Sequence, residues 1–356
     1  MKILHLCWSL DIGGMENMLV DIINYQVMHE DVSLLIVNDR INDSIFNRLD
    51  KRCHVKLLRR KEGSKNPFVL LQINGFLLTH HFDIIHLHNA DIIKYLWVKR
   101  NYVRTVHNTN IAIQNYRWHK GIIAISESVK QDLENRGVHG SVIIDNGVNF
   151  SLIKQRQRQG RNATFRMVQV SRILFEQKGQ DILVEAVHRL VAKGITDIHL
   201  DFIGTGPDMK RLEQLVNDSH LESYISLLGN QPREFIYEHL CDYDLFVQPS
   251  RFEGFGLTVA EAMGARIPVL VSENEGPLAI IENGKYGFTF KNKSVEDCAS
   301  QIEKLMTNYP SAEYMDAAYN HVHSLYSVDN TAQGYLDFYK KISKHAERNN
   351  NESDDK

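Results

Sequence analysis

Paired cysteines, a strong charge of one sign and a long apolar run are all missing from this sequence of 356 residues. Its four cysteines stand far apart, without the Cys-x-x-Cys spacing of a zinc or redox site, so they predict reduced thiols of a cytosolic protein rather than a disulfide scaffold. The formal net charge of −3 leaves no basic excess for binding a phosphate backbone, and we expect no nucleic-acid partner.

A membrane-spanning segment is missing as well. The most apolar stretch, VLLQINGFLLTHHF, contains Gln72 and Asn74, whereas a span needs roughly 20 apolar residues. The N-terminal stretch MKILHLCWSLDIGG is interrupted by Asp11 and has no small-residue cleavage site, so it predicts a first strand rather than a signal peptide. We therefore expect a cytoplasmic protein that is either dissolved or lies on the inner face of the cytoplasmic membrane.

The chain does contain a regular alternation of short apolar runs and longer amphipathic stretches. Its length and its 43% of hydrophobic residues suit two domains, and the alternation predicts βαβ units with parallel sheets. Strands are expected at residues 2–10, 32–38, 55–58, 83–88, 103–107, 121–126, 142–148, 165–173, 198–204, 224–229, 244–250 and 268–274. Helices are expected at residues 15–30, 180–194, 207–219 and from 314 onward.

The alternation stops at residues 153–163, where IKQRQRQGRNA is polar, basic and without periodicity, and then starts again. We expect an α/β protein of two Rossmann-like domains whose parallel sheets face each other across a cleft. The predicted segments are a first domain at 1–152, a second domain at 153–325, a C-terminal helix at 326–345 and a disordered tail at 346–356.

Residues 250–264, SRFEGFGLTVAEAMG, hold two carboxylates around the start of a predicted helix. In one continuous helix Glu253 and Glu261 would lie about 12 Å apart along the axis and be rotated by about 80°, too far apart to serve one small ligand easily. Gly254 and Gly256 instead predict a tight turn, with the helix beginning near Leu257. Free N–H groups then lie between the two acids, which suits a nucleoside diphosphate sugar. Considered alone, the stretch is explained equally well by a capped helix with surface acids.

This stretch resembles the EX7E region of the retaining glycosyltransferases of family 4, which have the GT-B fold. Other segments resemble that family in order and rough spacing, over about residues 1–300. Each motif is weak, but their ordered combination is specific. The segments are VSRILFEQKGQDILVEAV, DFIGTGPDMKRLEQL and LLGNQPREFIYEHLCDYDLFVQPS in the second domain, and GGMENMLVDI, DIIHLHN, RTVHN, AISESVKQDL and VIIDNGVN in the first.

The resemblance assigns the charged chemistry to a few residues. It implies that Arg172 and Lys178 bind the donor diphosphate, a sensible pairing of cations with phosphate oxygens. It implies that Gly14 lets the backbone approach the diphosphate and that His107 lies beside the reacting sugar. It also implies that the first domain holds the acceptor, the second holds the nucleotide sugar, and the last helix packs back on the first domain.

The acidic stretch receives the remaining roles. The resemblance implies that Glu253 lies at the donor sugar and that Glu261 accepts hydrogen bonds from the ribose hydroxyls. The backbone amides of Phe255, Gly256 and Leu257 would meet the sugar hydroxyls and the phosphates. The family often has glycine where this chain has Ser171, and many members have glutamate where it has Ala279.

The resemblance implies a retaining, metal-independent glycosyltransferase of the hexosyltransferase type without a cofactor. It would move a sugar from a UDP- or GDP-linked donor to a glycan or lipid-linked glycan acceptor, in bacterial surface polysaccharide (O-antigen or capsule) synthesis. Arg172, Lys178 and the helix N-terminus can stabilise the charge on the leaving diphosphate. We expect attack on the same face of the sugar with the departing phosphate as base, while Glu253 and His107 orient and polarise. Whether Glu253 also lowers the barrier stays open.

Two other functions fit the same motifs. A nucleotide-sugar epimerase of similar fold would convert the free donor without an acceptor. A non-catalytic nucleotide-sugar-binding subunit would bind the donor without releasing nucleoside diphosphate. The complete set of Glu253, Glu261, Arg172 and Lys178 argues against the second function.

Two signals for a metal are weaker than they look. Asp242 and Asp244 form an Asp-x-Asp string, but it joins a helix end to a predicted strand. His86 and His88 alternate on one predicted strand and so share a face, yet no third ligand has a convincing spacing. Packing or an acceptor-side contact explains the two histidines better than a metal site.

A basic stretch precedes the apolar helix that Asn66 and Pro67 predict. One interpretation presses this helix onto anionic lipid, with the headgroups bound by Arg59, Arg60, Lys61 and Lys65. The other interpretation, which the pattern favours slightly, is a core helix behind a solvated loop.

Overall fold

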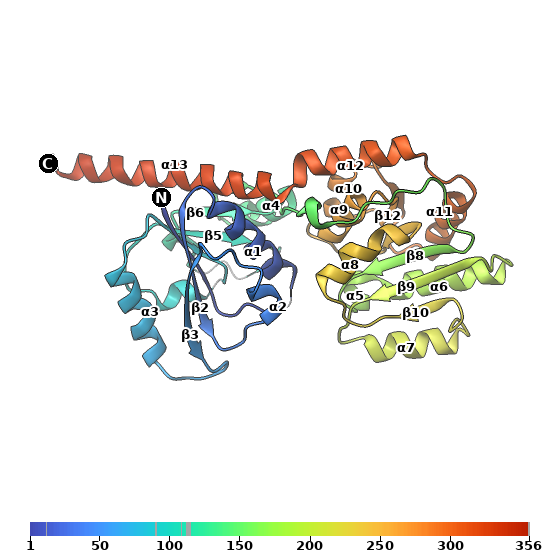
Figure 1. Cartoon of the computed structure of the whole chain (residues 1–356), viewed down its shortest axis with the longest axis horizontal. Coiled ribbons are helices and arrows are strands. Elements are labelled where there is room, and N and C mark those ends of the chain that lie inside the picture. Colours follow the sequence, from blue (N-terminus) through green and yellow to red (C-terminus); the bar gives the residue numbers. More distant parts are fainter. Residues whose placement is uncertain (12, 90, 108, 112–114, 355–356) are drawn as a thin grey trace. The chain divides into compact units, whose positions relative to one another are not determined.

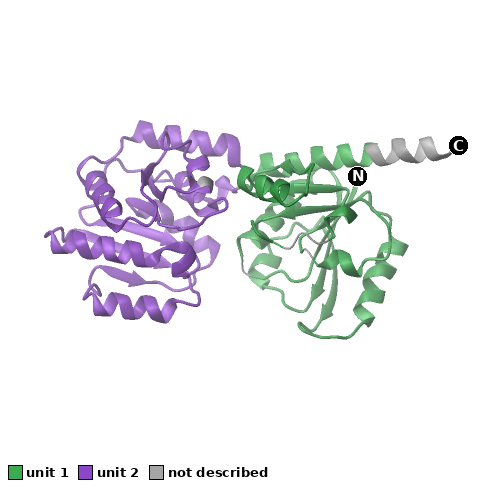
Figure 2. Cartoon of the chain, turned by 180° about the vertical axis from the view of Figure 1, so that it is seen from behind, with its two compact units in different colours: residues 1–147, 328–356 green, residues 148–327 purple. Residues whose placement is uncertain are grey.

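The computed structural model describes the backbone apart from residues 12, 90, 108, 112–114 and 355–356, and the side chains of residues 275 and 345–356 lie outside the described set as well. The described chain forms two compact units (Figure 2). Unit 1 comprises residues 1–147 and 328–356, and unit 2 comprises residues 148–327.

The chain passes from unit 1 to unit 2 after residue 147, slightly before the predicted boundary at 152. The backbone N–H of Val148 donates to the carbonyl of Tyr326 at 2.8 Å, which ties the segment to unit 2. Phe150 packs so closely on Gly264 that a Cβ there would lie 2.6 Å from its ring. The residues just before 152 therefore belong to the packing of the second unit.

Unit 1 is built on a parallel sheet with the strand order β3-β2-β1-β4-β5-β6-β7 (Figure 1). Its central strands are buried on both faces, which is why they appear in the sequence as continuous apolar runs. The strands are β1 (Lys2–Cys7), β2 (Asp31–Asn38), β3 (His54–Arg60), β4 (Ile84–Leu87), β5 (Tyr102–Val106), β6 (Gly121–Ala124) and β7 (Val142–Ile143).

Helices cover both faces of this sheet. On one face, α1 and α13 bury Leu19 and Tyr335 in a cluster with Ile3. On the other face, α3 buries Ile73 against Leu4. The helices are α1 (Gly14–Gln26), α2 (Asp43–Phe46), α3 (Phe68–Thr79), α4 (Glu127–Asn135) and α13 (Val328–Asp354), with 3-10 turns η1 (Ile92–Tyr95) and η2 (Tyr116–Trp118).

The helical tail predicted from residue 314 is divided into two helices that belong to different units. α12 (Ala312–Tyr326) lies in unit 2 and α13 packs in unit 1. Between them Ser327 has an extended backbone, with ψ of 144°, and forms a bridge with Val148. A disordered tail was predicted at 346–356, whereas the backbone of α13 stays helical to Asp354.

Unit 2 repeats the architecture of unit 1 with its own parallel sheet, in the order β10-β9-β8-β11-β12-β13. The strands are β8 (Phe165–Val170), β9 (Ile198–Ile203), β10 (Ile225–Leu227), β11 (Leu245–Gln248), β12 (Val269–Ser272) and β13 (Phe288–Phe290). The remaining elements are α5 (Phe175–Lys178), α6 (Gln180–Ala192), α7 (Met209–Asp218), α8 (Arg233–His239), α9 (Leu257–Gly264), α10 (Glu275–Ile280), α11 (Val295–Thr307), and 3-10 turns η3 (Phe150–Leu152) and η4 (Leu240–Asp242).

The two parallel sheets confirm the predicted fold class, and each segment predicted to hold a strand contains one. The short β13 was not predicted. No helix within the described part of the chain combines the length and apolarity that a membrane crossing requires.

The strand order places one topological switch point in each sheet. In unit 1, β1 lies between β2 and β4, so the connections leave it in opposite directions. In unit 2, β8 lies between β9 and β11 in the same way. Ligands of open parallel sheets bind outside the carboxyl ends of the strands at such switch points.

Candidate functional site

The switch point of unit 2 brings together the loops that follow β8 and β11. Gly179, between α5 and α6, has φ of 66° and lies so close to the second loop that a Cβ would be 2.1 Å from the carbonyl oxygen of Pro249. Arg251 forms two bonds with the carboxylate of Asp181, at 2.8 and 2.7 Å. The two loops are therefore held in fixed register.

Two residues of the predicted donor site meet at this point. The ammonium of Lys178 lies 2.5 Å from Oε2 of Glu253, and both side chains are largely buried, with 16% and 14% of their surface exposed. Gln248, at the end of β11, donates to the same carboxylate oxygen at 2.8 Å. Lys178, the last residue of α5, and Glu253, in a loop far along the chain, thus form one charged pair. This contact could not be predicted from the sequence.

Arg172 lies in the loop directly after β8, on the same switch point. Its carbonyl accepts a hydrogen bond from Gln180 at 3.0 Å, whereas its exposed guanidinium has no recorded partner among the described residues. Lys178 already has a carboxylate partner, whereas this arginine leaves one cation on the same switch point available to an incoming anion.

The helix that follows Glu253 begins where the sequence predicted. α9 starts at Leu257, after Gly256 with φ of 102°, a conformation that favours glycine. Within the described chain, no side chain caps this end, and the N–H groups of Gly256 and Leu257 make no backbone hydrogen bond. The side chain of Phe255 packs on Tyr326, so only its backbone can face a ligand.

Glu261 has partners of its own, on α8. The buried hydroxyl of Tyr237 donates to its Oε1 at 2.8 Å, and the guanidinium of Arg233 lies 4.6 Å from the centre of the tyrosine ring. Burial and the neighbouring carboxylate raise the pKa of Tyr237 well above its ordinary value, so the hydroxyl remains a donor. Glu253 and Glu261 therefore have separate partners. Tyr237 receives no role from the resemblance, so it could not be identified from the sequence.

The remaining predicted residues lie in unit 1. Gly14 is the first residue of α1, in the connection that follows β1. His107 directly follows β5, and its Nε2 is buried without a hydrogen-bond partner among the described residues. Burial and the nearby charge of Arg104 lower the pKa of His107 to about 4, so its imidazole is neutral at pH 7.

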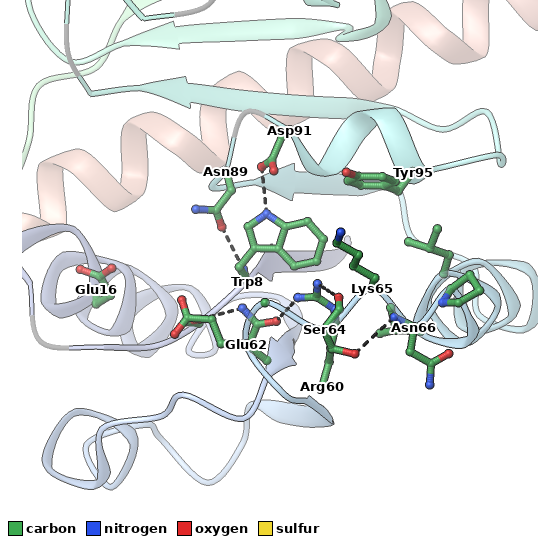
Figure 3. Close-up of a pocket in the computed structure, with 16 residues that line it drawn as sticks. Trp8, Glu16, Arg60, Glu62, Ser64, Lys65, Asn66, Asn89, Asp91 and Tyr95 are labelled. Carbon is green, nitrogen blue, oxygen red and sulfur yellow. Dashed lines mark hydrogen bonds between the residues drawn. The ribbon is translucent and has the colours of Figure 1, made fainter.

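Unit 1 also holds a cavity of about 630 Å³ that the sequence did not predict. It lies at the carboxyl ends of β1 to β4, on the switch point, and the Trp8 side chain stands in it (Figure 3). The indole nitrogen of Trp8 donates to Asp91 at 2.8 Å, and its backbone N–H donates to Asn89 at 2.9 Å. Tyr95 meets the Trp8 ring edge-on, with 6.0 Å between the ring centres.

Two of the four basic residues predicted for a membrane line this cavity. Arg60 bonds to Asn38 at 2.8 Å and lies 5.6 Å from the Trp8 ring centre. Lys65 points into the same space (Figure 3). The other two, Arg59 and Lys61, are exposed to solvent.

The Asp-x-Asp string is structural. Asp244 is fully buried and bonds to Arg156 at 2.8 Å and to the side chain of Asn162 at 2.8 Å. Asp242 pairs with His239 at 3.0 Å on the surface. Because Asp244 is buried and paired with Arg156, the string does not offer two free carboxylates to a metal. The sequence had also favoured a structural role for the string over a metal site.

His86 and His88 gain a third neighbour, His5, from the adjacent strand β1, and these three form the one group of possible metal ligands among the described residues. Five of their six ring nitrogens are engaged in hydrogen bonds, including His5 Nδ1 with His88 Nε2 at 3.0 Å and His86 Nε2 with Thr105 at 2.9 Å. No carboxylate belongs to the group. This arrangement is a hydrogen-bonded core network, in line with the packing role preferred from the sequence.

Comparison with known proteins agrees with the two-unit architecture. Residues 12–152 match the family profile "Glycosyltransferase Family 4", and residues 152–321 match the profile "Glycosyl transferases group 1". The chain is 24% identical, over 272 residues, to an uncharacterized glycosyltransferase of Methanocaldococcus jannaschii, with 76% of this chain and 72% of that protein covered.

A second relative is the poly(ribitol-phosphate) alpha-N-acetylglucosaminyltransferase of Staphylococcus aureus, 26% identical over 234 residues, or 64% of this chain. The chain spans only 45% of that protein's length. Among solved structures, Anabaena HepE in complex with UDP and glucose superposes with a TM-score of 0.78 at 19% identity, covering 96% of this chain and 100% of that chain. Taken together, the two profiles and the shared architecture show that the chain belongs to the glycosyltransferases of the GT-B fold.

Proposed function

We propose that the protein transfers a sugar from a UDP- or GDP-linked donor to a glycan or lipid-linked glycan acceptor, with retention of the anomeric configuration. One observation carries this proposal. The pair of Lys178 and Glu253 lies beside the uncapped start of α9, on the switch point of unit 2, with Arg172 in the adjoining loop. Cations, free backbone N–H groups and a carboxylate are the groups that a nucleotide sugar requires.

The donor would replace the contact between Lys178 and Glu253. A diphosphate offers the ammonium of Lys178 an anion with more charge than a single carboxylate, and Arg172 can bind the same group. Glu253, released from Lys178 but still held by Gln248, can then accept hydrogen bonds from the sugar hydroxyls. Glu261 would bind the ribose, with Tyr237 fixing its orientation.

Transfer creates negative charge on the departing diphosphate and positive charge on the sugar. Arg172, Lys178 and the amides of Phe255, Gly256 and Leu257 would stabilise the first charge, so we propose that no metal is needed. The acceptor would attack the face from which the diphosphate leaves, with the departing phosphate taking its proton. Glu253 and the neutral imidazole of His107 would orient the sugar, and Gly14 would allow the backbone to approach the donor.

The biological setting that we propose is the synthesis of surface polysaccharide, an O-antigen or a capsule, on the cytoplasmic side of the membrane. Named relatives support it: one is the poly(ribitol-phosphate) enzyme of Staphylococcus aureus, and another is a colanic acid biosynthesis glycosyltransferase of Salmonella typhimurium. The proposal includes a peripheral contact with anionic membrane through the basic stretch, in which Arg59 and Lys61 are exposed and do not line the cavity of unit 1.

The substitution Lys178→Ala tests the donor site. It removes a cation from the leaving group, and we expect turnover to fall by about 100-fold or more, because one such contact contributes roughly 3 kcal/mol in the transition state. Release of nucleoside diphosphate in the presence of a lipid-linked acceptor from bacterial membranes measures the rate. Lys193→Ala, which removes an exposed lysine paired with Glu303, is the matched control.

A folded Lys178→Ala protein with normal turnover would contradict the donor assignment. The same reaction, followed by NMR, reports the configuration of the new linkage, and inversion would contradict retention. Conversion of the free nucleotide sugar without acceptor would instead identify an epimerase.

A further inference from the structure

α3 is a surface helix without a charged residue. Its twelve residues, FVLLQINGFLLT, bury Ile73 and Leu77 on the sheet. The opposite side exposes Phe68, Leu71 and Leu78, with 58%, 54% and 68% of their surface accessible. The outward face of a surface helix in a globular protein normally carries polar or charged residues, so this face is suited to a non-aqueous partner.

An exposed tryptophan is fixed beside the same helix. Asn74 of α3 donates to the carbonyl of Tyr95 at 2.9 Å and accepts from the backbone N–H of Trp97 at 2.7 Å. These two bonds hold Trp97 next to α3 with 62% of its surface exposed. Tryptophan with an apolar body and an exposed edge is typical of the boundary between lipid and water.

Basic residues border this face. Lys61 precedes α3, and Lys94 and Lys99 stand on either side of Trp97, all exposed. The nearby acid Glu62 is already engaged, since it pairs with Arg40 at 3.3 Å. An apolar face with a basic border is complementary to a bilayer that contains anionic lipid.

This face is continuous with the cavity of unit 1. Pro67, Val69 and Leu70 at the start of α3 line the cavity, and Tyr95 does so as well. The cavity has charged side chains among apolar ones in its lining, whereas the outer side of the same helix is apolar. Lys65 points into the cavity and makes no ion pair or hydrogen bond within the described residues (Figure 3). One helix therefore borders both a cavity with charged groups and an apolar surface.

We propose that α3 and Trp97 lie on an anionic lipid bilayer and that the adjoining cavity takes the sugar-bearing anionic head of a lipid-linked acceptor. The proposal rests on the proposed function, because it selects the lipid-linked acceptor over a free glycan. Lys65 meets the phosphate of the head, and Trp8 with Asp91 meets its sugar, through the ring face and the carboxylate. The apolar chain stays in the bilayer under α3.

Vesicle flotation of the full chain tests the surface. We expect wild-type protein to bind vesicles of phosphatidylcholine with phosphatidylglycerol and to bind pure phosphatidylcholine weakly. The double substitution Phe68→Ser with Leu71→Ser removes two exposed apolar side chains that the bilayer would bury, so its partition should fall by about tenfold or more. Leu325→Ser removes a side chain of similar exposure in unit 2 and should leave partition unchanged.

Three outcomes would overturn the proposal: no binding to anionic vesicles at low salt, equal binding by the double variant, or a dimer in solution that the double variant abolishes. Thermal shift with UDP and GDP separates this result from the donor assignment, since the substituted residues lie in unit 1. Nucleotide stabilisation without vesicle binding removes the lipid surface and leaves the proposed function standing. Vesicle binding without nucleotide stabilisation would remove the donor assignment and leave the lipid surface standing.

Lys65→Gln tests the cavity. It should raise the KM for a lipid-linked acceptor several-fold while the KM for the donor and the binding of vesicles stay close to wild type. Lys51→Gln, at an exposed lysine of unit 1 that does not line the cavity, is its matched control and should leave the acceptor KM unchanged. An unchanged acceptor KM in Lys65→Gln would remove the cavity from the proposal.

Discussion

Glu253 has a different partner before and after the donor binds in the reaction we propose. In the free protein its carboxylate lies 2.5 Å from the ammonium of Lys178 and 2.8 Å from the amide of Gln248. The two contacts hold the carboxylate and the ammonium in place. The contact with Lys178 also means that an incoming diphosphate has to compete with a carboxylate for the same lysine.

Glu253→Gln separates the competition for Lys178 from the role of the carboxylate in turnover. The amide removes a negative charge beside the phosphate site, so we expect nucleoside diphosphate to bind about 2- to 5-fold more tightly, which is on the order of 0.5–1 kcal/mol. Turnover should fall if the carboxylate also stabilises the positively charged sugar. Calorimetric titration with UDP or GDP and the steady-state rate measure the two quantities, and weaker nucleotide binding would contradict the competition.

Residues with a motif could be predicted from the sequence, and residues without one could not. Glu253, Glu261 and Lys178 stand in recognisable patterns, although their partners do not. Gln248 ends a buried strand and Tyr237 lies on a helix, where an amide or an aromatic residue gives no signal beyond packing. The contact across two loops depends on the order of the strands, which the spacing of residues along the chain does not contain.

At the level of elements, the joint between α5 and α6 determines how the proposed donor site is assembled. Gly179 ends α5 with φ of 66° and starts α6, and its Cα faces the carbonyl of Pro249. The joint therefore fixes the position of Lys178, the preceding residue, relative to the loop that carries Glu253. Only glycine combines this backbone conformation with so close an approach.

Gly179→Ala should destabilise unit 2 and weaken the donor site together. The added Cβ would lie 2.1 Å from the carbonyl oxygen of Pro249, in a strained backbone conformation. We expect a loss of about 2–4 kcal/mol in the free energy of unfolding. Gly194→Ala is the matched control, because Gly194 has φ of 86° and nothing within 4 Å of its Cβ position, so it should lose only about 1 kcal/mol. Urea unfolding compares them, and equal losses would contradict the clash.

The strands were predictable as elements because parallel sheets bury continuous apolar runs. β13 escaped prediction since it has three residues and only one of them is fully buried. The break between α12 and α13, at Ser327, lies close to the predicted start of the C-terminal helix at 326, although no glycine or proline marks it. The cavity of unit 1 draws on loops after several strands, so it becomes visible only with the strand order.

At the level of the whole chain, the last helix is held in unit 1 by a buried polar network. Tyr339 of α13 bonds to Nδ1 of His86, and Tyr335 bonds to Thr105 at 3.1 Å. His5 joins the network through Gln26 of α1, with 2.7 Å between Nε2 and Oε1. These groups are neutral and hydrogen-bonded. The first strand and the last helix of the chain are therefore connected by one uncharged polar network.

Acid should therefore destabilise unit 1 before carboxylates elsewhere are protonated. Burial lowers the pKa of His5 from 6.5 to about 4 and holds those of His86 and His88 well below their ordinary value. The unfolded chain takes up protons below pH 6.5 while the folded chain does not, so this stability is complete above that pH and is lost as pH falls toward 4. For His5 alone, the free energy of unfolding at pH 5 is lower by about 2 kcal/mol.

Unfolding temperatures measured from pH 8 to pH 4.5 should fall steeply below pH 6.5, and less steeply in His5→Phe, which removes one titrating group. A wild-type profile that stays flat to pH 5 would mean that these histidines are already charged in the folded protein.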